Sequence, residues 1–241
     1  MRELFNCEKY GLKINCLYEI LATTISKDKL SKEISPNTSC MGIQFIENDI
    51  LKLKPYRTTR TYKNLKQNGL ITINFVKNVY FYAIAALKRE NSPIGIEKFP
   101  LKNYAYKDID IKNDETGDKL ILVFPYIKSS WGCAFCKVIK EGELTVDDEL
   151  GKAKVTEFTT RVLRFIQLKD SYSVVNRAEN LALELIILTT RLKVAKETKN
   201  NFIYQKINEK YQDLKLNLLK FGHNKIALKT LEITDKYIKS L

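Results

Sequence analysis

The stretch Arg57-Thr-Thr-Arg-Thr-Tyr-Lys-Asn-Leu-Lys-Gln-Asn-Gly-Leu-Ile-Thr-Ile-Asn74 decides the fold of this chain. It predicts a short helix over about 58–67, a glycine stop at Gly69, and a buried strand over 70–76. Four residues spaced at i, i+3, i+4 and i+7 would share one face of the helix: Arg57, Arg60, Thr61 and Asn64. That face is usually apolar in a globular protein, whereas here every member is a hydrogen-bond donor.

The start of this helix favours an anion. A helix N-terminus carries positive partial charge and N–H groups without intrahelical partners. Placing Arg57, Arg60 and Lys63 there is unfavourable unless an anion arrives, and hydroxyls, cations and N–H groups together suit a phosphate. The alternative is an ordinary solvated helix capped by Thr58 or Thr59. These residues alone leave both interpretations open.

The chain up to residue 170 reads as rich in strands. β-Branched and apolar runs predict strands over 12–25, 40–46, 49–54, 105–111, 119–128, 131–139 and 153–168, with a second helix over 79–88. Residues 27–37 and Glu141-Gly142-Glu143 predict turns, and 89–119 should be largely irregular. Cys133 and Cys136 would point to opposite faces of their strand, so we expect two buried strand cysteines rather than a metal or redox pair.

The pattern becomes helical after Asp170. Apolar residues recur at helical spacing from about 176 to 192, from 201 to 220 and from 224 to 240, and Asn176 resembles a helix cap. We therefore predict an α+β protein with two parts: a β-rich domain over 1–170 and a helical C-terminal region over 171–241.

Composition restricts the classes of function. The 241 residues include 41 Lys and Arg against 28 Asp and Glu, a formal net charge of +13. Lysines are spread along the chain among acidic residues, although 191–241 holds twelve basic and five acidic residues. This charge leaves a basic nucleic-acid-associated module as an alternative, but we do not expect it to be the main function. No apolar run is long enough for a bilayer, and no secretory signal is recognisable, so we expect a cytoplasmic protein without a membrane partner.

The sequence offers little catalytic chemistry. The single histidine, His223, stands in a helix connection, which is more typical of a structural role. The five cysteines have no framework spacing and no partners for a zinc site, so we predict no metal. Neither a Walker A sequence nor a G-x-G-x-x-G is present. No side chain stands out as an acid or base, and the catalytic residues remain unassigned.

The polar constellation at 57–64 is accompanied by a second feature, the segment Asn37-Thr-Ser-Cys-Met-Gly42. We expect it to be a loop that enters a strand, with small residues that leave backbone groups open to a planar ligand. An anion site beside such a loop suits a phosphorylated, ring-bearing small molecule.

Three segments resemble a known family. Tyr18-Glu19-Ile20 with Asn37 to Ile43 is similar to a Tyr-Glu opening followed by Asn-Ala-Ala-Pro-Met-Gly-Val. Residues 58–65 and 69–74 are similar to a Ser-x-Thr-Tyr-x-Asn-Leu helix and a strand ending in Val-Asn. Asn176-Arg177-Ala178, Glu184 and Thr189-Thr190-Arg191 resemble its helical region. The family is the mainly archaeal domain of unknown function 447, which belongs with the flavin reductase-like and pyridoxamine phosphate oxidase-like FMN-binding split barrels.

The resemblance implies a split β-barrel with a C-terminal three-helix region, and a homodimer that binds FMN near the interface. Thr58, Thr61 and Asn64, helped by Arg57 or Arg60, would hold the phosphate. The flavin ring and ribityl chain would be lined by Asn37, Ser39, Cys40, Met41 and Gly42, and Asn74 would lie near the ring or its support. Cys40 stands where the family has proline, and Thr38 and Ser39 replace two alanines, which adds polarity to the loop.

The resemblance favours an FMN-binding protein, with a flavin-dependent oxidoreductase of unknown substrate as the finer hypothesis. A flavin carrier or sensor without turnover and the basic nucleic-acid-associated module are the alternatives. FMN would carry hydride or electron chemistry, and the protein would supply placement and electrostatics.

Overall fold

A computed structural model describes residues 5–27, 34–112, 119–148, 151–170, 177–220 and 224–241. The chain divides into two compact units. The barrel unit contains residues 1–76, 100–146 and 153–170, and the helical unit contains 77–99, 147–152 and 171–241. Sequence analysis placed 77–99 in the first domain, whereas their helix α2 (Val79–Leu87) packs on the C-terminal helices. Within the described part of the chain, no helix is long and apolar enough to cross a membrane.

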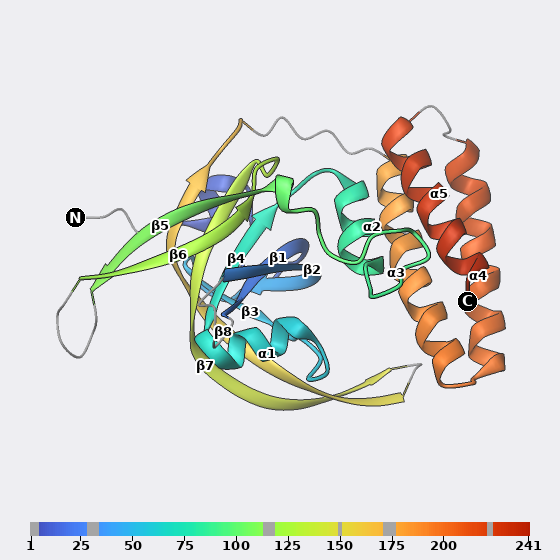
Figure 1. Cartoon of the computed structure of the whole chain (residues 1–241), viewed down its shortest axis with the longest axis horizontal. Coiled ribbons are helices and arrows are strands. Elements are labelled where there is room, and N and C mark those ends of the chain that lie inside the picture. The colour runs from blue at the N-terminus through green and yellow to red at the C-terminus, as the bar shows by residue number, and fades with distance from the viewer. Residues whose placement is uncertain (1–4, 28–33, 113–118, 149–150, 171–176, 221–223) are drawn as a thin grey trace. The chain divides into compact units, whose positions relative to one another are not determined.

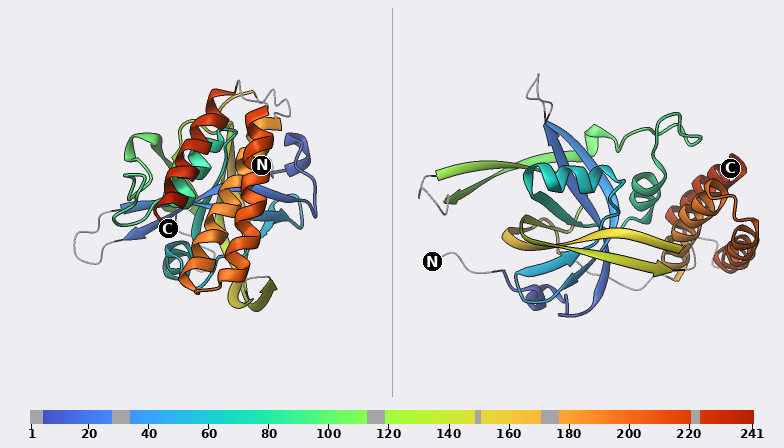
Figure 2. Two further views of the ribbon diagram at one scale, coloured as in Figure 1. Left: turned by 90° about the vertical axis from the view of Figure 1, so that its right-hand side faces the viewer. Right: turned by 90° about the horizontal axis from the view of Figure 1, so that it is seen from below.

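The barrel unit is built on a closed antiparallel barrel (Figure 1). Its strands follow in the order β1 (Leu17–Lys27), β2 (Ile34–Phe45), β3 (Ile50–Leu53), β8 (Gly151–Gln167), β7 (Gly132–Asp148) and β4 (Leu70–Phe75). Pairing of Leu21 with Asn74 and of Thr24 with Ile71 closes the barrel between β1 and β4. Figure 2 shows the coiling of these strands from two further sides.

Shorter elements complete this unit. Helix α1 (Arg60–Asn68) lies between β3 and β4 in the chain. The hairpin of β5 (Tyr104–Lys112) and β6 (Lys119–Ile127) forms a separate two-stranded sheet. The 3₁₀ turns η1 (Cys7–Tyr10) and η2 (Leu101–Asn103) precede β1 and β5.

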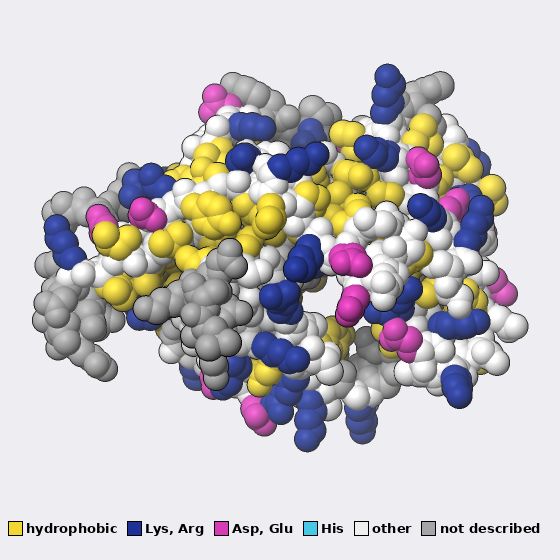
Figure 3. Space-filling model, in the orientation of Figure 1, with side chains coloured by type: hydrophobic (Ala, Val, Ile, Leu, Met, Phe, Trp, Pro, Cys, Tyr) yellow, Lys and Arg dark blue, Asp and Glu magenta, His cyan; other side chains and the backbone are white. Residues whose placement is uncertain are grey.

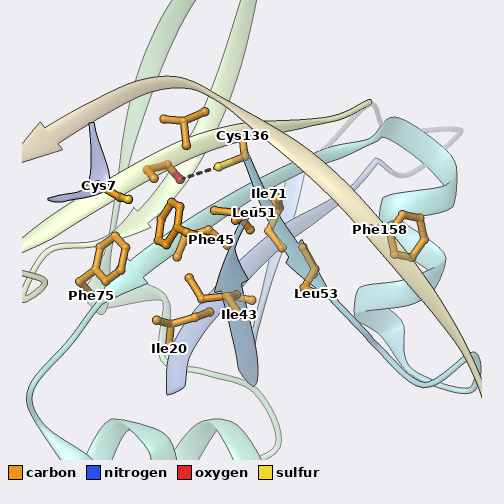
Figure 4. Packing of buried hydrophobic residues seen from close by; sticks show 14 of the residues in the cluster. Cys7, Ile20, Ile43, Phe45, Leu51, Leu53, Ile71, Phe75, Cys136 and Phe158 are labelled. Atoms are coloured by element: carbon orange, nitrogen blue, oxygen red, sulfur yellow. Dashed lines mark hydrogen bonds between the residues drawn. The ribbon is translucent and has the colours of Figure 1, made fainter. Parts of the chain in front are cut away.

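The barrel interior holds the main apolar core. Side chains from β1, β2, β3, β4, β7 and β8 meet there, and Figure 4 shows Ile20, Ile43, Phe45 and Leu51 among them. Leu65 of α1 joins the same cluster and Tyr62 of α1 packs against it, so two apolar side chains anchor the helix to the barrel.

Strand β4 and the middle of β1, residues 20–25, are buried on both faces. All six residues of β4 are buried, because its inner side chains face the core and its outer ones lie beneath the hairpin. The outer cluster joins Ile25 and Leu70 to Ile109 and Phe124 of the hairpin. Cys136 belongs to the inner cluster and Cys133 to the outer one, which confirms that the two buried cysteines point to opposite faces.

The ends of α1 follow their local signals. Thr59 is the N-cap, and its hydroxyl accepts a hydrogen bond from the N–H of Tyr62 at 3.2 Å. Gly69 ends the helix with φ of +67°, a conformation that L side chains rarely adopt. The predicted helix, glycine stop and buried strand are therefore confirmed.

Three local predictions were wrong. The first strand begins at Leu17 rather than residue 12. Residues 37–42 are not a loop but the middle of β2, because each of them pairs with β1. Residues 141–143 are not a turn, since β7 continues through them to Asp148.

The helical unit has three long helices: α3 (Arg177–Glu197), α4 (Asn201–Lys220) and α5 (Lys225–Lys239). They run alongside one another in orange to red in Figure 2. Their predicted inward residues meet in one cluster that includes Leu185, Ile207, Tyr211 and Leu231. The predicted three-helix region is confirmed. Asn176 and His223 lie outside the described residues.

Asn74 joins three parts of the barrel unit. The residue is fully buried, and its amide nitrogen donates to the carbonyl oxygen of Leu21 at 2.8 Å and to the hydroxyl of Thr23 at 3.0 Å. Its amide oxygen accepts from the N–H of Ile127 at 2.8 Å. One side chain thus connects β4 to β1 and to the end of β6.

We expect Asn74→Ala to lower the free energy of unfolding by about 2–4 kcal/mol, because each buried polar group that loses its partner costs about 1–3 kcal/mol. Denaturant unfolding followed by circular dichroism measures this change. Gln67→Ala on the exposed side of α1 is the matched control and should change stability little. An equal, small effect of both substitutions would contradict the role of Asn74.

Candidate functional site

Helix α1 is attached to the barrel by a row of buried hydrogen bonds from Thr61 and Asn64 to strands β1 and β2, which we call the polar seam. The hydroxyl of Thr61 lies 2.8 Å from that of Ser39 and accepts from the amide of Asn37 at 3.3 Å. One turn later, the amide of Asn64 donates to the hydroxyl of Thr24 at 2.9 Å. Thr61 and Asn64 are 1% and 3% exposed, so they hold the helix on β1 and β2 and have little surface left for a ligand.

The predicted helix face is therefore only partly present. Arg57 precedes the N-cap and is not on the helix, and Arg60 is exposed while Thr61 and Asn64 face inward. The alternative of a fully solvated helix is wrong as well, because the polar face is buried against strands. Polar strand residues, rather than solvent or a ligand, satisfy its donors.

The β2 residues that were expected to line the flavin ring lie on two opposite faces of the strand. Asn37 and Ser39 point toward α1, and Met41 packs against the inner core. Thr38 lies on the opposite face, where its hydroxyl is 2.6 Å from that of Tyr104 and 2.8 Å from that of Thr23. Cys40 and Gly42 are two and four residues after Thr38 in the same strand, and side chains alternate between the two faces. They therefore lie on the same outer face as Thr38.

Asn74 also lies on the outer face, beneath the hairpin. Its donors and its acceptor are all engaged within the protein. Its position agrees with a residue that supports the walls of the site, and not with one that contacts a ligand directly. The structure thus brings Asn37, Ser39, Thr61 and Asn64 together around α1 and separates them from Cys40, Gly42 and Asn74.

The groups that remain accessible cluster at the start of α1. Thr58 and Arg60 are exposed, and the guanidinium of Arg60 donates to the hydroxyl of Ser26 at 3.0 Å. The first turn contains no acidic residue. In the described part of the chain, the backbone N–H groups of Arg60 and Thr61 have no recorded partner. This end of the helix therefore offers uncompensated donors.

Arg57 adds a cation with one unused donor. Its Nη2 forms an ion pair of 2.6 Å with the Oε1 of Glu143, whose side chain is 82% exposed. Its Nε is buried and has no hydrogen-bond partner among the described residues. Such an orphaned donor is unusual and marks a place where an acceptor would be stabilised.

A hollow of about 170 Å³ lies between α1 and the extended part of β7. Glu143 borders it together with Glu141, which forms an ion pair of 2.6 Å with Lys66. Sequence analysis did not single out either carboxylate, because Gly142 between them suggested a turn. The sequence signal that could have identified them is their i, i+2 spacing, because residues two apart in a strand lie on the same face.

The C-x-x-C pair of β7 offers no reactive thiol. Burial raises the pKa of Cys133 to about 12, and burial also raises the pKa of Cys136. The thiolate is the reactive form, so both cysteines are inert at neutral pH. Desolvation likewise raises the pKa of Tyr104, which therefore stays a neutral hydrogen-bonding phenol. Among the described residues, no group of three or more potential metal ligands comes together.

Residues 18–164 match the family model described as the N-terminal domain of the protein of unknown function DUF447. The chain belongs to this family. The match includes every strand of the barrel together with α1 and the hairpin. No curated protein matches the chain.

Solved structures agree with this DUF447 fold. An FMN-bound DUF447 protein from Methanosarcina mazei is 16% identical, with a TM-score of 0.66 over 96% of this chain and 100% of that one. This likeness confirms the predicted fold, a split β-barrel with a helical C-terminal region. An FMN-binding protein from Thermus thermophilus is 11% identical, with a TM-score of 0.40 over 64% of this chain and 72% of that one. A flavin reductase complexed with NADP⁺ is 16% identical, with a TM-score of 0.37 over 69% and 88%.

The cysteine environments of this DUF447 chain give a direct test. Cys16 is exposed and Cys40 half-buried, whereas Cys7, Cys133 and Cys136 are fully buried. A variant with Cys16→Ser and Cys40→Ser should show no reaction with Ellman's reagent until denaturant is added, because the remaining thiols are inaccessible. Rapid labelling of the native double variant would contradict the burial of the C-x-x-C pair.

Proposed function

We propose that this protein binds FMN and holds its phosphate at the start of helix α1. The observation that carries the proposal is the orphaned Nε of Arg57, which lies just before a helix N-terminus with unpartnered N–H groups. The FMN-bound state of the DUF447 protein from Methanosarcina mazei supports it. A phosphate satisfies such donors better than water does, because it accepts several charge-assisted hydrogen bonds.

The residues at this site fit a phosphate group. Arg57 would contribute a charged donor, Thr58 a hydroxyl, and Arg60 and Thr61 their backbone N–H groups. Arg60 adds a second cation, and its guanidinium donates to the neutral hydroxyl of Ser26. Thr61 and Asn64 take a different part from the one that the resemblance implies, since they orient α1 through the polar seam.

Using some residues to fix α1 and others to bind the phosphate has a physical advantage. A helix fixed by buried hydrogen bonds presents its N–H groups in one geometry, so little conformational freedom is lost when an anion binds. Asn37 and Ser39 contribute to the same end by fixing Thr61 from the strand side. The binding energy is then concentrated on donors that do not have to be reorganised.

A flavin-dependent oxidoreductase activity on a small molecule is the finer proposal. Bound FMN would supply hydride or electron transfer. The chain's own residues would bind and orient the cofactor. NADH or NADPH consumption by the FMN-loaded protein separates turnover from a carrier or sensor, which would bind FMN without consuming either.

Arg57→Gln should weaken FMN binding about ten- to thirtyfold, because a hydrogen bond to a charged group contributes about 1.5–2 kcal/mol. Quenching of flavin fluorescence during titration measures the affinity. Riboflavin lacks the phosphate, so its affinity should not change in the variant.

The matched control is Arg161→Gln, which removes the same charge from the barrel at an exposed pair with Asp49. It should leave FMN affinity within about twofold, because exposed pairs are weak. Failure of the native protein to take up FMN, by absorbance or by titration, would refute the proposal. Binding that depends steeply on salt and prefers RNA or DNA would support the alternative nucleic-acid module.

We also propose that the protein forms a homodimer through the outer face of the β5–β6 hairpin. Tyr106 and Ile121 are 51% and 61% exposed and share the face opposite to the buried Ile109 and Phe124. In Figure 3, hydrophobic side chains gather where Figure 1 places this hairpin. Asp108 and Asp110 lie on the same face of β5. Large exposed apolar side chains with a polar surround are typical of an interface.

Ile121→Lys should shift the protein from dimer to monomer, because it places a charge in an apolar contact. Light scattering after size-exclusion chromatography measures the mass across a dilution series. Phe202→Lys on α4 is the control, since Phe202 is 74% exposed but lies in the helical unit. If Phe202→Lys dissociated the dimer and Ile121→Lys did not, the interface would lie on the helical unit. If the native protein were a monomer, the proposed dimer would be refuted.

A further inference from the structure

The ion pair between Arg57 and Glu143 sets a condition on the proposed site. Glu143 presents a carboxylate to the cation that the phosphate would need, at 2.6 Å from Nη2. A carboxylate and a phosphate are alternative partners for one guanidinium, because both accept its forked donors. The protein therefore carries its own anion at the place where we expect the ligand's anion.

We propose that Glu143 competes with the ligand phosphate for Arg57 and so lowers the affinity of the site for a phosphorylated ligand. This inference rests on the proposed function and assigns a role to a residue outside the polar seam. A ligand must replace the carboxylate, and a dianionic phosphate carries more charge and more acceptor oxygens than Glu143 does. A neutral flavin such as riboflavin has nothing with which to replace it.

The structure makes this competition reversible. The side chain of Glu143 is 82% exposed and that of Arg57 is 29% exposed, so leaving the pair uncovers no apolar surface at Glu143. Glu143 also borders the hollow beside α1, which leaves space for its carboxylate after release. Arg57 stays in place, because its Nε is buried.

The pair also explains why a cation can stand before a helix N-terminus without a ligand. The first turn of α1 has no acidic residue to offset the partial charge of the helix and Arg57. Glu143 offsets that charge from β7. Only a ligand with a phosphate has to displace the carboxylate of Glu143, so this carboxylate affects the affinity for FMN and not that for riboflavin.

The test uses Glu143→Gln in the full-length protein, with FMN and riboflavin titrated separately. Removing the carboxylate should tighten FMN binding about two- to fivefold, because an exposed ion pair has that worth, and should leave riboflavin unchanged. Glu141→Gln is the matched control. It removes the same charge two residues away on the same strand, but its partner is Lys66, so it should change FMN affinity less.

A double-mutant cycle separates competition from general electrostatics. In an Arg57→Gln background, Glu143→Gln should no longer tighten FMN binding, because no shared cation remains. Native FMN binding with equal effects of Glu143→Gln and Glu141→Gln would overturn the inference and leave the proposed function standing. A Glu143→Gln gain that persists without Arg57 would overturn it as well.

The remaining outcomes are also decisive. Uptake of FMN by the Glu143→Gln variant but not by the native protein would refute the proposed function and this inference with it, because the ligand phosphate would then fail to replace the native carboxylate. Absence of FMN binding in both would refute the proposed function and this inference together. Thermal unfolding of each variant, followed without ligand, shows that the comparison is made between folded proteins.

Discussion

Burial of β4 and of the middle of β1 on both faces is the constraint on which the barrel unit depends. Polar groups inside such a layer cannot reach water, so each needs a partner within the protein. On the outer face, Asn74 connects through Thr23 and Thr38 to Tyr104 of the hairpin. On the inner face, Thr24 and Asn37 connect to α1. The same strand therefore fixes a hairpin on one side and a helix on the other.

This arrangement determines which part of α1 is available for chemistry. Because Thr61 and Asn64 are engaged on the barrel, the helix cannot rotate to offer them to solvent without breaking buried hydrogen bonds. Its accessible donors are then those of its first turn and of Arg57. Attachment to the barrel uses the inward face of this nine-residue helix, and the proposed anion site uses its N-terminal end.

Much of the fold could be predicted, because its local signals agree with its tertiary contacts. Thr59, Gly69 and the apolar run of β4 act within a few residues, and so do the apolar periods of α3 to α5. The segment at 37–42 was misread because its polar side chains look like a loop until Thr61, Thr23 and Tyr104 are seen to bond with them. Ser39 and its partner Thr61 are 22 residues apart in the chain. Thr38 is 15 residues from its partner Thr23 and 66 residues from its partner Tyr104. Sequence pattern alone does not reveal such distant partners.

The position of Glu143 illustrates the same limit and has a consequence for the site. Gly142 suggested a turn, but β7 passes straight through it and brings two carboxylates to α1. An acidic residue in the first turn of α1 would neutralise the helix start permanently, since it could not move away from its own helix. A carboxylate on a separate strand can leave and return without disturbing the seam. In the proposed exchange, a charge balance supplied from another strand rather than from within the helix would allow the protein's own anion to be replaced by that of a ligand.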